Sequence, residues 1–136
     1  MLGRVRARAR EPWWGAVLEA PDPRALAAFY SQLLGWPVAS EEPGWVALKP
    51  PDGFVYLAFQ HADGFVAPVW PPEAGRQRMT MHLDFEVADL TTSVTDAVAL
   101  GARVATHQPQ AHVRVLLDPA GHPFCLYVDT SAGDRT

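Results

Sequence analysis

A polar face that could take part in chemistry occurs in the segment 81–87, where apolar and polar residues alternate. Such alternation is typical of a strand that presents one face to a core and the other to water or to a cavity. The polar face carries His82, Asp84 and Glu86. An imidazole in this setting could act as a general base or anchor a ligand carbonyl. The simpler interpretation is a structural histidine that is satisfied by a cross-strand carboxylate.

The single cysteine of the chain, Cys125, is the second group with chemical potential. If His82 activated it as a thiolate, it would be a nucleophile. The sequence offers no third residue to orient such a pair, and a free cysteine more often serves as a small buried apolar residue. One cysteine also excludes an intramolecular disulfide and a cysteine zinc cluster. We therefore do not expect covalent catalysis.

The polar strand is predicted to run directly into a helix. Asp89 is placed to cap the first turn, and apolar residues then recur at helical spacing until Gly101. We predict a strand at 80–87 and a helix at 90–100. Further strands are expected at 103–106, 112–117 and 124–128, the last two being separated by the turn sequence DPAG.

The first half of the chain shows the same order of elements. A strand is predicted at 14–20, and Asp22 with Pro23 marks the start of a helix that Gly35 ends. Strands are expected at 36–40, 45–49 and 54–60, separated by turn-forming EEPG and PPDG. A repeated unit of this kind predicts two similar halves that cover one another, with a ligand held on their bare sheet faces.

The length of 136 residues is that of one domain. We predict a flexible basic arm at 1–12, a single domain at 13–130 and a tail at 131–136. Within the domain, module one covers 13–61, a linker rich in proline and glycine covers 62–78, and module two covers 79–130.

Charge and hydropathy exclude several classes of function. Four arginines occupy the arm, but the net charge is −4, so the remainder of the chain is acidic and nucleic-acid binding is not expected. No apolar run approaches the roughly 20 residues that a membrane span requires. With a single cysteine and no recognisable signal peptide, we expect a cytoplasmic protein.

Three stretches resemble the glyoxalase/bleomycin-resistance/extradiol-dioxygenase group, also called the vicinal oxygen chelate superfamily, and in particular its glyoxalase-like domains. They are APDPRALAAFYSQLLGW, HLDFEVADLTTSVTDAVALGA and HVRVLLDPAGHPFCLY. The resemblance implies an α+β fold in which two βαβββ modules form a cup-shaped, mixed eight-stranded sheet with the helices outside. It also implies a homodimer.

Metal-dependent members of the superfamily place ligands on the first and last strands of each module. The matching positions here are Gly15, His82, Cys125 and, for the last strand of module one, either Leu57 or Gln60. Because a divalent ion needs three or four good donors, we expect no metal cofactor, with His82 as the ligand if there is one. A divalent metal remains the alternative.

The resemblance places the polar strand faces inside the cup, with aromatic rings available for stacking on a flat ligand. The expected ligand contacts are His82, Asp84, Cys125, Tyr127, Gln60, Trp45, Trp70 and Glu19. The preferred hypothesis is a glyoxalase-like protein that binds a small aromatic or polar molecule without an intact metal site. The alternatives are a metal-dependent lyase or isomerase resembling glyoxalase I, and a non-catalytic interaction domain.

Overall fold

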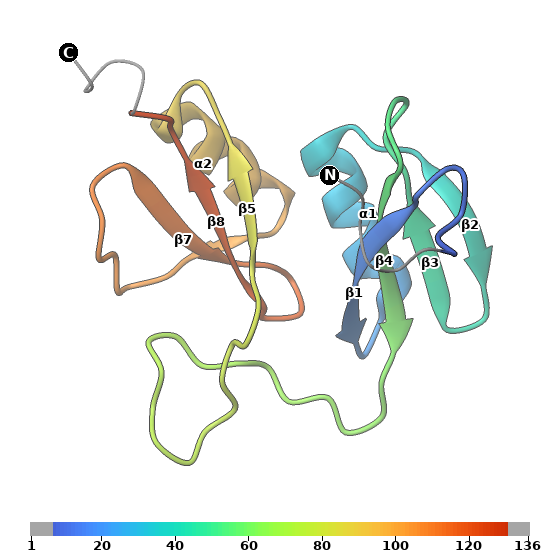
Figure 1. Ribbon diagram of the computed structural model, residues 1–136. Coiled ribbons are helices and arrows are strands. Elements are labelled where there is room, and N and C mark those ends of the chain that lie inside the picture. The colour runs from blue at the N-terminus through green and yellow to red at the C-terminus, as the bar shows by residue number, and fades with distance from the viewer. Residues whose placement is uncertain (1–6, 131–136) are drawn as a thin grey trace. The chain divides into compact units, whose positions relative to one another are not determined.

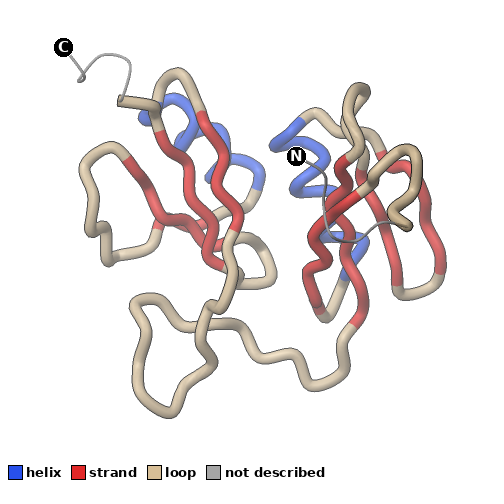
Figure 2. The backbone as a smooth tube through the Cα atoms, in the orientation of Figure 1, coloured by secondary structure: helices blue, strands red, loops and turns tan. Residues whose placement is uncertain are grey.

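The computed structural model describes residues 7–130, which form two compact units divided between Ala62 and Asp63 (Figure 1). The unit boundary follows the last strand of the first module. Each unit contains one helix and one four-stranded sheet, and the tube in Figure 2 shows the same order of elements in both. The α+β class and the two βαβββ modules predicted from the sequence are confirmed. A cup shared by both sheets stays a prediction.

The first unit has a mixed sheet with strand order β1-β4-β3-β2. Its strands are β1 (Trp14–Ala20), β2 (Val38–Glu42), β3 (Trp45–Leu48) and β4 (Val55–His61). β1 and β4 are parallel, and the other pairs are antiparallel. A parallel pair needs a crossover, which the helix α1 (Pro23–Leu34) begins.

Helix α1 begins and ends where the sequence predicts. The carboxylate of Asp22 accepts a hydrogen bond from the Ala25 N–H at 3.1 Å, and Gly35 ends the helix with a φ of 72°. Its apolar face includes Tyr30, which is fully buried and stacks on Phe59 of β4 with ring centroids 5.6 Å apart. The core of the first unit therefore lies between α1 and its sheet.

The second unit repeats this arrangement with strand order β5-β8-β7-β6. Its elements are β5 (Leu83–Glu86), α2 (Leu90–Leu100), β6 (Arg103–Val104), β7 (Val113–Leu117) and β8 (Pro123–Tyr127). Here β5 and β8 are the parallel pair. Asp89 caps α2 by accepting a hydrogen bond from the Thr92 N–H at 3.0 Å.

Several strands differ in length from the prediction. The strand expected at 80–87 contains only Leu83–Glu86, and the strand expected at 103–106 contains only Arg103–Val104. β5 and β6 are the edge strands of their sheet, and a residue at an edge counts as strand only where the single neighbouring strand pairs with it. The strand expected at 36–40 is Val38–Glu42, because Glu42 pairs with Trp45 across a tight turn.

The predicted linker contains no helix or strand, and all of it except Ala62 belongs to the second unit. The indole N–H of Trp70 donates to the His107 carbonyl at 3.0 Å, and Phe65 lies 5.2 Å from the His122 ring, centroid to centroid. Of the predicted arm, residues 7–12 are exposed. Residues 1–6 and the predicted tail at 131–136 lie outside the described residues.

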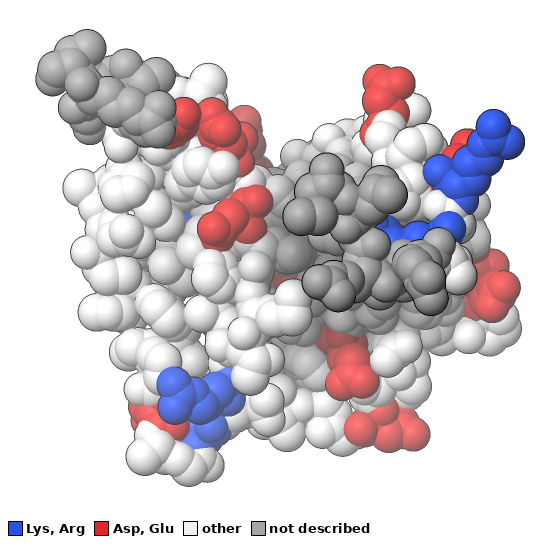
Figure 3. Space-filling model, in the orientation of Figure 1, with Lys and Arg blue, Asp and Glu red and all other residues white. Residues whose placement is uncertain are grey.

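In the part of the chain that the structure describes, no helix is both long enough and apolar enough to cross a bilayer. Acidic and basic side chains are scattered over the face of the molecule drawn in Figure 3.

Candidate functional site

The sheet of the second unit has one apolar face and one polar face. Phe124 and Leu126 of β8 are buried on the side that α2 covers, at 0% and 2% exposure. The alternate residues, Cys125 and Tyr127, point to the other side. Cys125 is the register partner of Asp84 on β5, and Tyr127 is the partner of Glu86. The alternation in the sequence therefore predicted these faces correctly.

Three side chains on the polar face form a compact cluster, which we call the triad: His82, Asp84 and Cys125. One potential donor atom from each lies within 4.8 Å of the others. The Nε2 of His82 is 3.0 Å from Oδ1 of Asp84. The histidine is thus satisfied by a carboxylate, but the carboxylate belongs to the same chain segment and not to a facing strand.

Burial raises the pKa of the Cys125 thiol from 9.0 to about 11, and Asp84 adds to this rise through its negative charge and by accepting a hydrogen bond from the thiol. The thiol is therefore protonated at neutral pH. A protonated thiol is a poor nucleophile and a poor metal ligand until it loses its proton. That Cys125 takes no part in covalent catalysis stays a prediction.

The triad forms part of an open hollow of about 270 Å³ in the second unit. The hollow is lined by His82, Asp84, Gln110, His112, Val113, Cys125 and Tyr127. Gln110 and His112 were not among the predicted contacts. The Val128 N–H donates to the carbonyl of His112 at 3.1 Å. The strands predicted at 112–117 and 124–128 already include His112 and Val128, which meet one step beyond the last register pair, Val113–Tyr127.

The predicted contacts of the first module lie together on its own sheet. Gln60 of β4 is the register partner of both Glu19 on β1 and Trp45 on β3. The Gln60 amide donates to the Glu19 carboxylate at 3.4 Å. The structure thus brings Glu19, Gln60 and Trp45 into one row, and their role in ligand binding stays a prediction.

The positions that the resemblance implies for a metal do not fit a four-donor site. Gly15 has no side chain, and the space beside it is filled, because a β-carbon there would lie 2.5 Å from the ring carbons of Tyr56. Leu57 is buried and offers no donor. Of the two candidates on β4, Gln60 shares the sheet face of Gly15, since the Glu19–Gln60 pair is four register pairs away from the Gly15–Tyr56 pair along parallel strands. Cys125 holds its proton. Of the positions that the resemblance implies, only His82 carries a conventional metal ligand in its usual state.

Trp70 is the remaining predicted contact. Its indole N–H is bonded to the His107 carbonyl, its ring centroid is 5.8 Å from that of His107, and it does not line the hollow. Its participation in binding stays a prediction.

A second polar pair, Asp118 and His122, lies at the turn before β8, where the sequence predicted only the turn DPAG. Asp118 is 1% exposed, and its Oδ1 accepts hydrogen bonds from the N–H groups of Ala120, Gly121 and His122 at 2.9 to 3.0 Å. Its Oδ2 is 3.1 Å from Nδ1 of His122. With these partners, the carboxylate is fully engaged in holding the turn.

Comparisons with known proteins agree with this architecture. Residues 15–127 match the sequence profile of a family described as glyoxalase-like domain. A comparison with curated proteins finds no match.

Three solved structures illustrate the similarity. A glyoxalase/bleomycin resistance protein/dioxygenase family enzyme from Burkholderia phytofirmans PsJN has a TM-score of 0.64 at 19% identity, covering 84% of this chain and 95% of its own. The fosfomycin resistance protein FosX from Mesorhizobium loti has a TM-score of 0.64 at 12% identity, covering 94% and 100%. TnmS3, an antibiotic binding protein from Streptomyces sp. CB03234, has a TM-score of 0.56 at 16% identity, covering 85% and 93%. At these identities the likeness establishes the fold.

Proposed function

Because this chain belongs to the glyoxalase-like domain family, we propose that it binds a small aromatic or polar organic molecule in the hollow on the second sheet, without the four-donor metal site of metal-dependent relatives. The observation that carries the proposal is the composition of the hollow. It combines a carboxylate, imidazoles, an amide and a phenol with the apolar side chain of Val113. A few polar groups that fix orientation beside an aromatic ring are typical of small-molecule sites.

The triad determines which hydrogen-bond donors and acceptors this site offers to a ligand. Asp84 accepts hydrogen bonds from the Cys125 thiol and interacts with Nε2 of His82. When His82 is neutral and carries its proton on Nε2, its Nδ1 is a free acceptor. The hollow thus presents acceptors on β5 and the phenol of Tyr127 on β8, which favours a ligand with N–H or O–H donors on a flat ring.

Two of the similar structures support a binding role. One is described as an antibiotic binding protein and another as a fosfomycin resistance protein. Both descriptions involve a small organic molecule, and we propose the same class of ligand for this chain. We propose no covalent step, because the thiol is protonated at neutral pH.

A titration followed by backbone amide NMR tests the proposal, with a panel of nitrogen- and hydroxyl-bearing aromatic compounds as probes. We expect at least one probe to shift the amides around Asp84, His112 and Tyr127. Asp84→Ala should weaken its binding about tenfold, since removal of a charged hydrogen-bond partner costs about 1.5–3 kcal/mol. Asp96→Ala, an exposed change on α2, should leave the affinity unchanged. If no probe binds, or if Asp84→Ala binds as well as the wild type, the hollow is not the ligand site.

The second candidate function is a metal-dependent lyase or isomerase, and the triad is the observation that favours it. An imidazole, a carboxylate and a thiol within 4.8 Å could together hold one divalent ion if the thiol loses its proton. Metal analysis of protein purified without a histidine tag separates the two candidates. Protein that contains no metal and shows no change in stability with added nickel, zinc or manganese would remove this alternative.

We also propose that the chain forms a twofold homodimer, as the family resemblance implies. Light scattering coupled to size exclusion measures the molar mass directly. A mass equal to that of one 14.9 kDa chain would contradict the proposal.

A further inference from the structure

Arg114 of β7 is a cation in an otherwise apolar row of the second sheet. It is the register partner of Leu126, and its neighbour on the same face two residues on, Leu116, is fully buried. Residues on this face meet α2 and not the hollow, since Val113 and Val115 carry the opposite face. A charged residue at such a position requires a reason beyond packing.

Only one of the three guanidinium nitrogens of Arg114 makes hydrogen bonds within the described residues. Its Nη1 donates to the carbonyls of Gln110, Ala111 and Val113 at 3.3, 3.1 and 2.8 Å. Among residues 7–130, neither Nε nor Nη2 makes a hydrogen bond, and no carboxylate pairs with this arginine. Nε and Nη2 together form the fork that binds a carboxylate through two parallel hydrogen bonds.

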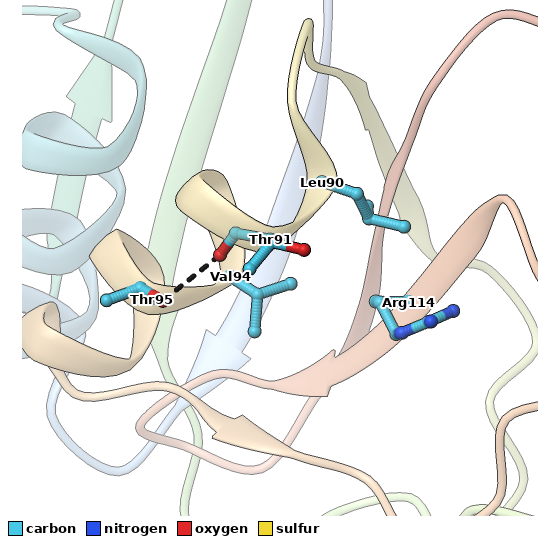
Figure 4. Close-up of a pocket in the computed structure, with 5 residues that line it drawn as sticks. All are labelled: Leu90, Thr91, Val94, Thr95 and Arg114. Atoms are coloured by element: carbon cyan, nitrogen blue, oxygen red, sulfur yellow. Dashed lines mark hydrogen bonds between the residues drawn. The ribbon is translucent and has the colours of Figure 1, made fainter.

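A pocket of about 260 Å³ opens beside this arginine, between α2 and β7. Figure 4 shows Arg114 on one side and α2 on the other, with Leu90, Thr91, Val94 and Thr95 along the helix. Leu90 and Val94 are half-buried, and the described part of α2 has only one fully buried residue, Ala97. The helix therefore leaves apolar surface uncovered next to a cation that has no counter-ion among the described residues.

The first turn of α2 does not supply that counter-ion. Asp89, the acidic residue that directly precedes α2, accepts a hydrogen bond from the Thr92 N–H through its Oδ1 at 3.0 Å. The Thr95 hydroxyl donates to the Thr91 carbonyl at 3.0 Å, drawn as the dashed line in Figure 4, so it acts within the helix.

We propose that this pocket binds a small organic monocarboxylate with a short apolar tail. The carboxylate pairs with Nε and Nη2 of Arg114, and the tail lies against Leu90 and Val94. An anion with an apolar end matches both properties of the pocket, whereas a neutral apolar molecule would leave the arginine without a counter-ion. The site is on the face of the sheet opposite the hollow, so it does not depend on the proposed function.

Titration of the full chain with hexanoate, followed by backbone amide NMR, tests the proposal. We expect saturable shifts of the amides of Leu90, Val94 and Arg114, with a dissociation constant in the range of about 1 mM that suits so small a ligand. Hexanamide has the same tail without the charge and should bind about tenfold more weakly. Arg114→Lys keeps the charge but removes the fork, and should weaken hexanoate binding about tenfold.

Two further variants provide a second test of the pocket and a control. Val94→Glu places a competing carboxylate at the pocket and leaves Arg114 and its carbonyl bonds in the chain, so it should abolish hexanoate binding even if Arg114→Lys fails to fold. Arg103→Lys, on an exposed part of β6, should bind hexanoate like the wild type. Equal binding of hexanoate and hexanamide, equal binding by wild type and Val94→Glu, or no shift at about 10 mM hexanoate would each overturn the proposal.

Discussion

The ring of Tyr56 covers Gly15 on the neighbouring strand so closely that a β-carbon at residue 15 would lie 2.5 Å from ring carbons Cδ2 and Cε2 and from the Tyr56 carbonyl oxygen. The two residues are register partners on the parallel strands β4 and β1. At residue 15 the space beside β1 is therefore filled by an aromatic ring and by backbone of β4, and it leaves no room for a side chain.

We expect Gly15→Ala to lower the free energy of unfolding by about 1–3 kcal/mol, because the added methyl group must displace the Tyr56 ring or the backbone of β4. Urea unfolding followed by circular dichroism measures the change. Tyr56→Ala in the same chain should recover part of the loss and not all of it, since the carbonyl oxygen remains at 2.5 Å. A Gly15→Ala variant as stable as the wild type would show that the contact is not tight.

Cys125 should titrate with a midpoint near pH 11. The pKa of Cys125 is higher in the folded state than its ordinary value of 9.0. The contribution of the protonated thiol to the free energy of unfolding is therefore fully present below pH 9.0 and is lost as the pH rises through about 11. Thiolate absorbance at 240 nm, with Cys125→Ala subtracted to remove the tyrosines, follows the titration directly. Asp84→Asn should lower the midpoint, because it removes the neighbouring negative charge. A wild-type midpoint below 9.0 would contradict the described environment.

Asp118→Ala should lower the free energy of unfolding by about 2–4 kcal/mol, because three backbone N–H groups lose their common acceptor. Asp118→Asn keeps an acceptor oxygen and should cost about half as much. Thermal and urea unfolding provide the measurement. As a control, the exposed Asp52→Ala should change stability by no more than about 0.5 kcal/mol. Equal effects at residues 118 and 52 would mean that the carboxylate does not hold the turn.

Amide hydrogens of α2 should exchange with solvent at least about tenfold faster than those of α1. Helix α1 buries five residues, Pro23, Leu26, Ala27, Phe29 and Tyr30, whereas Ala97 is the only one buried in the described α2. Less apolar burial makes local opening less costly. Hydrogen exchange measured by NMR tests this directly. Equal protection of both helices would show that α2 is covered in solution, for example by a second copy of the chain.

The order of elements was readable from the sequence because it depends on neighbouring residues. Alternation at 81–87 marked the polar face of a strand, and Asp22, Asp89, Gly35 and Gly101 marked the helix ends. These are local properties: the side chain of a capping residue bonds to a backbone group within its own first turn. The repeat of the order was equally visible, and it led to the family resemblance.

Only the tertiary structure decided which polar residues meet. Asp84 and Cys125 are far apart in the chain and become neighbours because β5 pairs with β8. The same pairing brings the Asp84 carboxylate next to the Cys125 thiol, where it contributes to the raised pKa of the thiol. The hydrogen bonds from Arg114 to backbone carbonyls, and the position of His112 beside the hollow, depend on the conformation of the segment 110–113. Contacts of this kind follow from strand register and side-chain packing across long sequence separations, which a one-dimensional pattern of residue types does not encode.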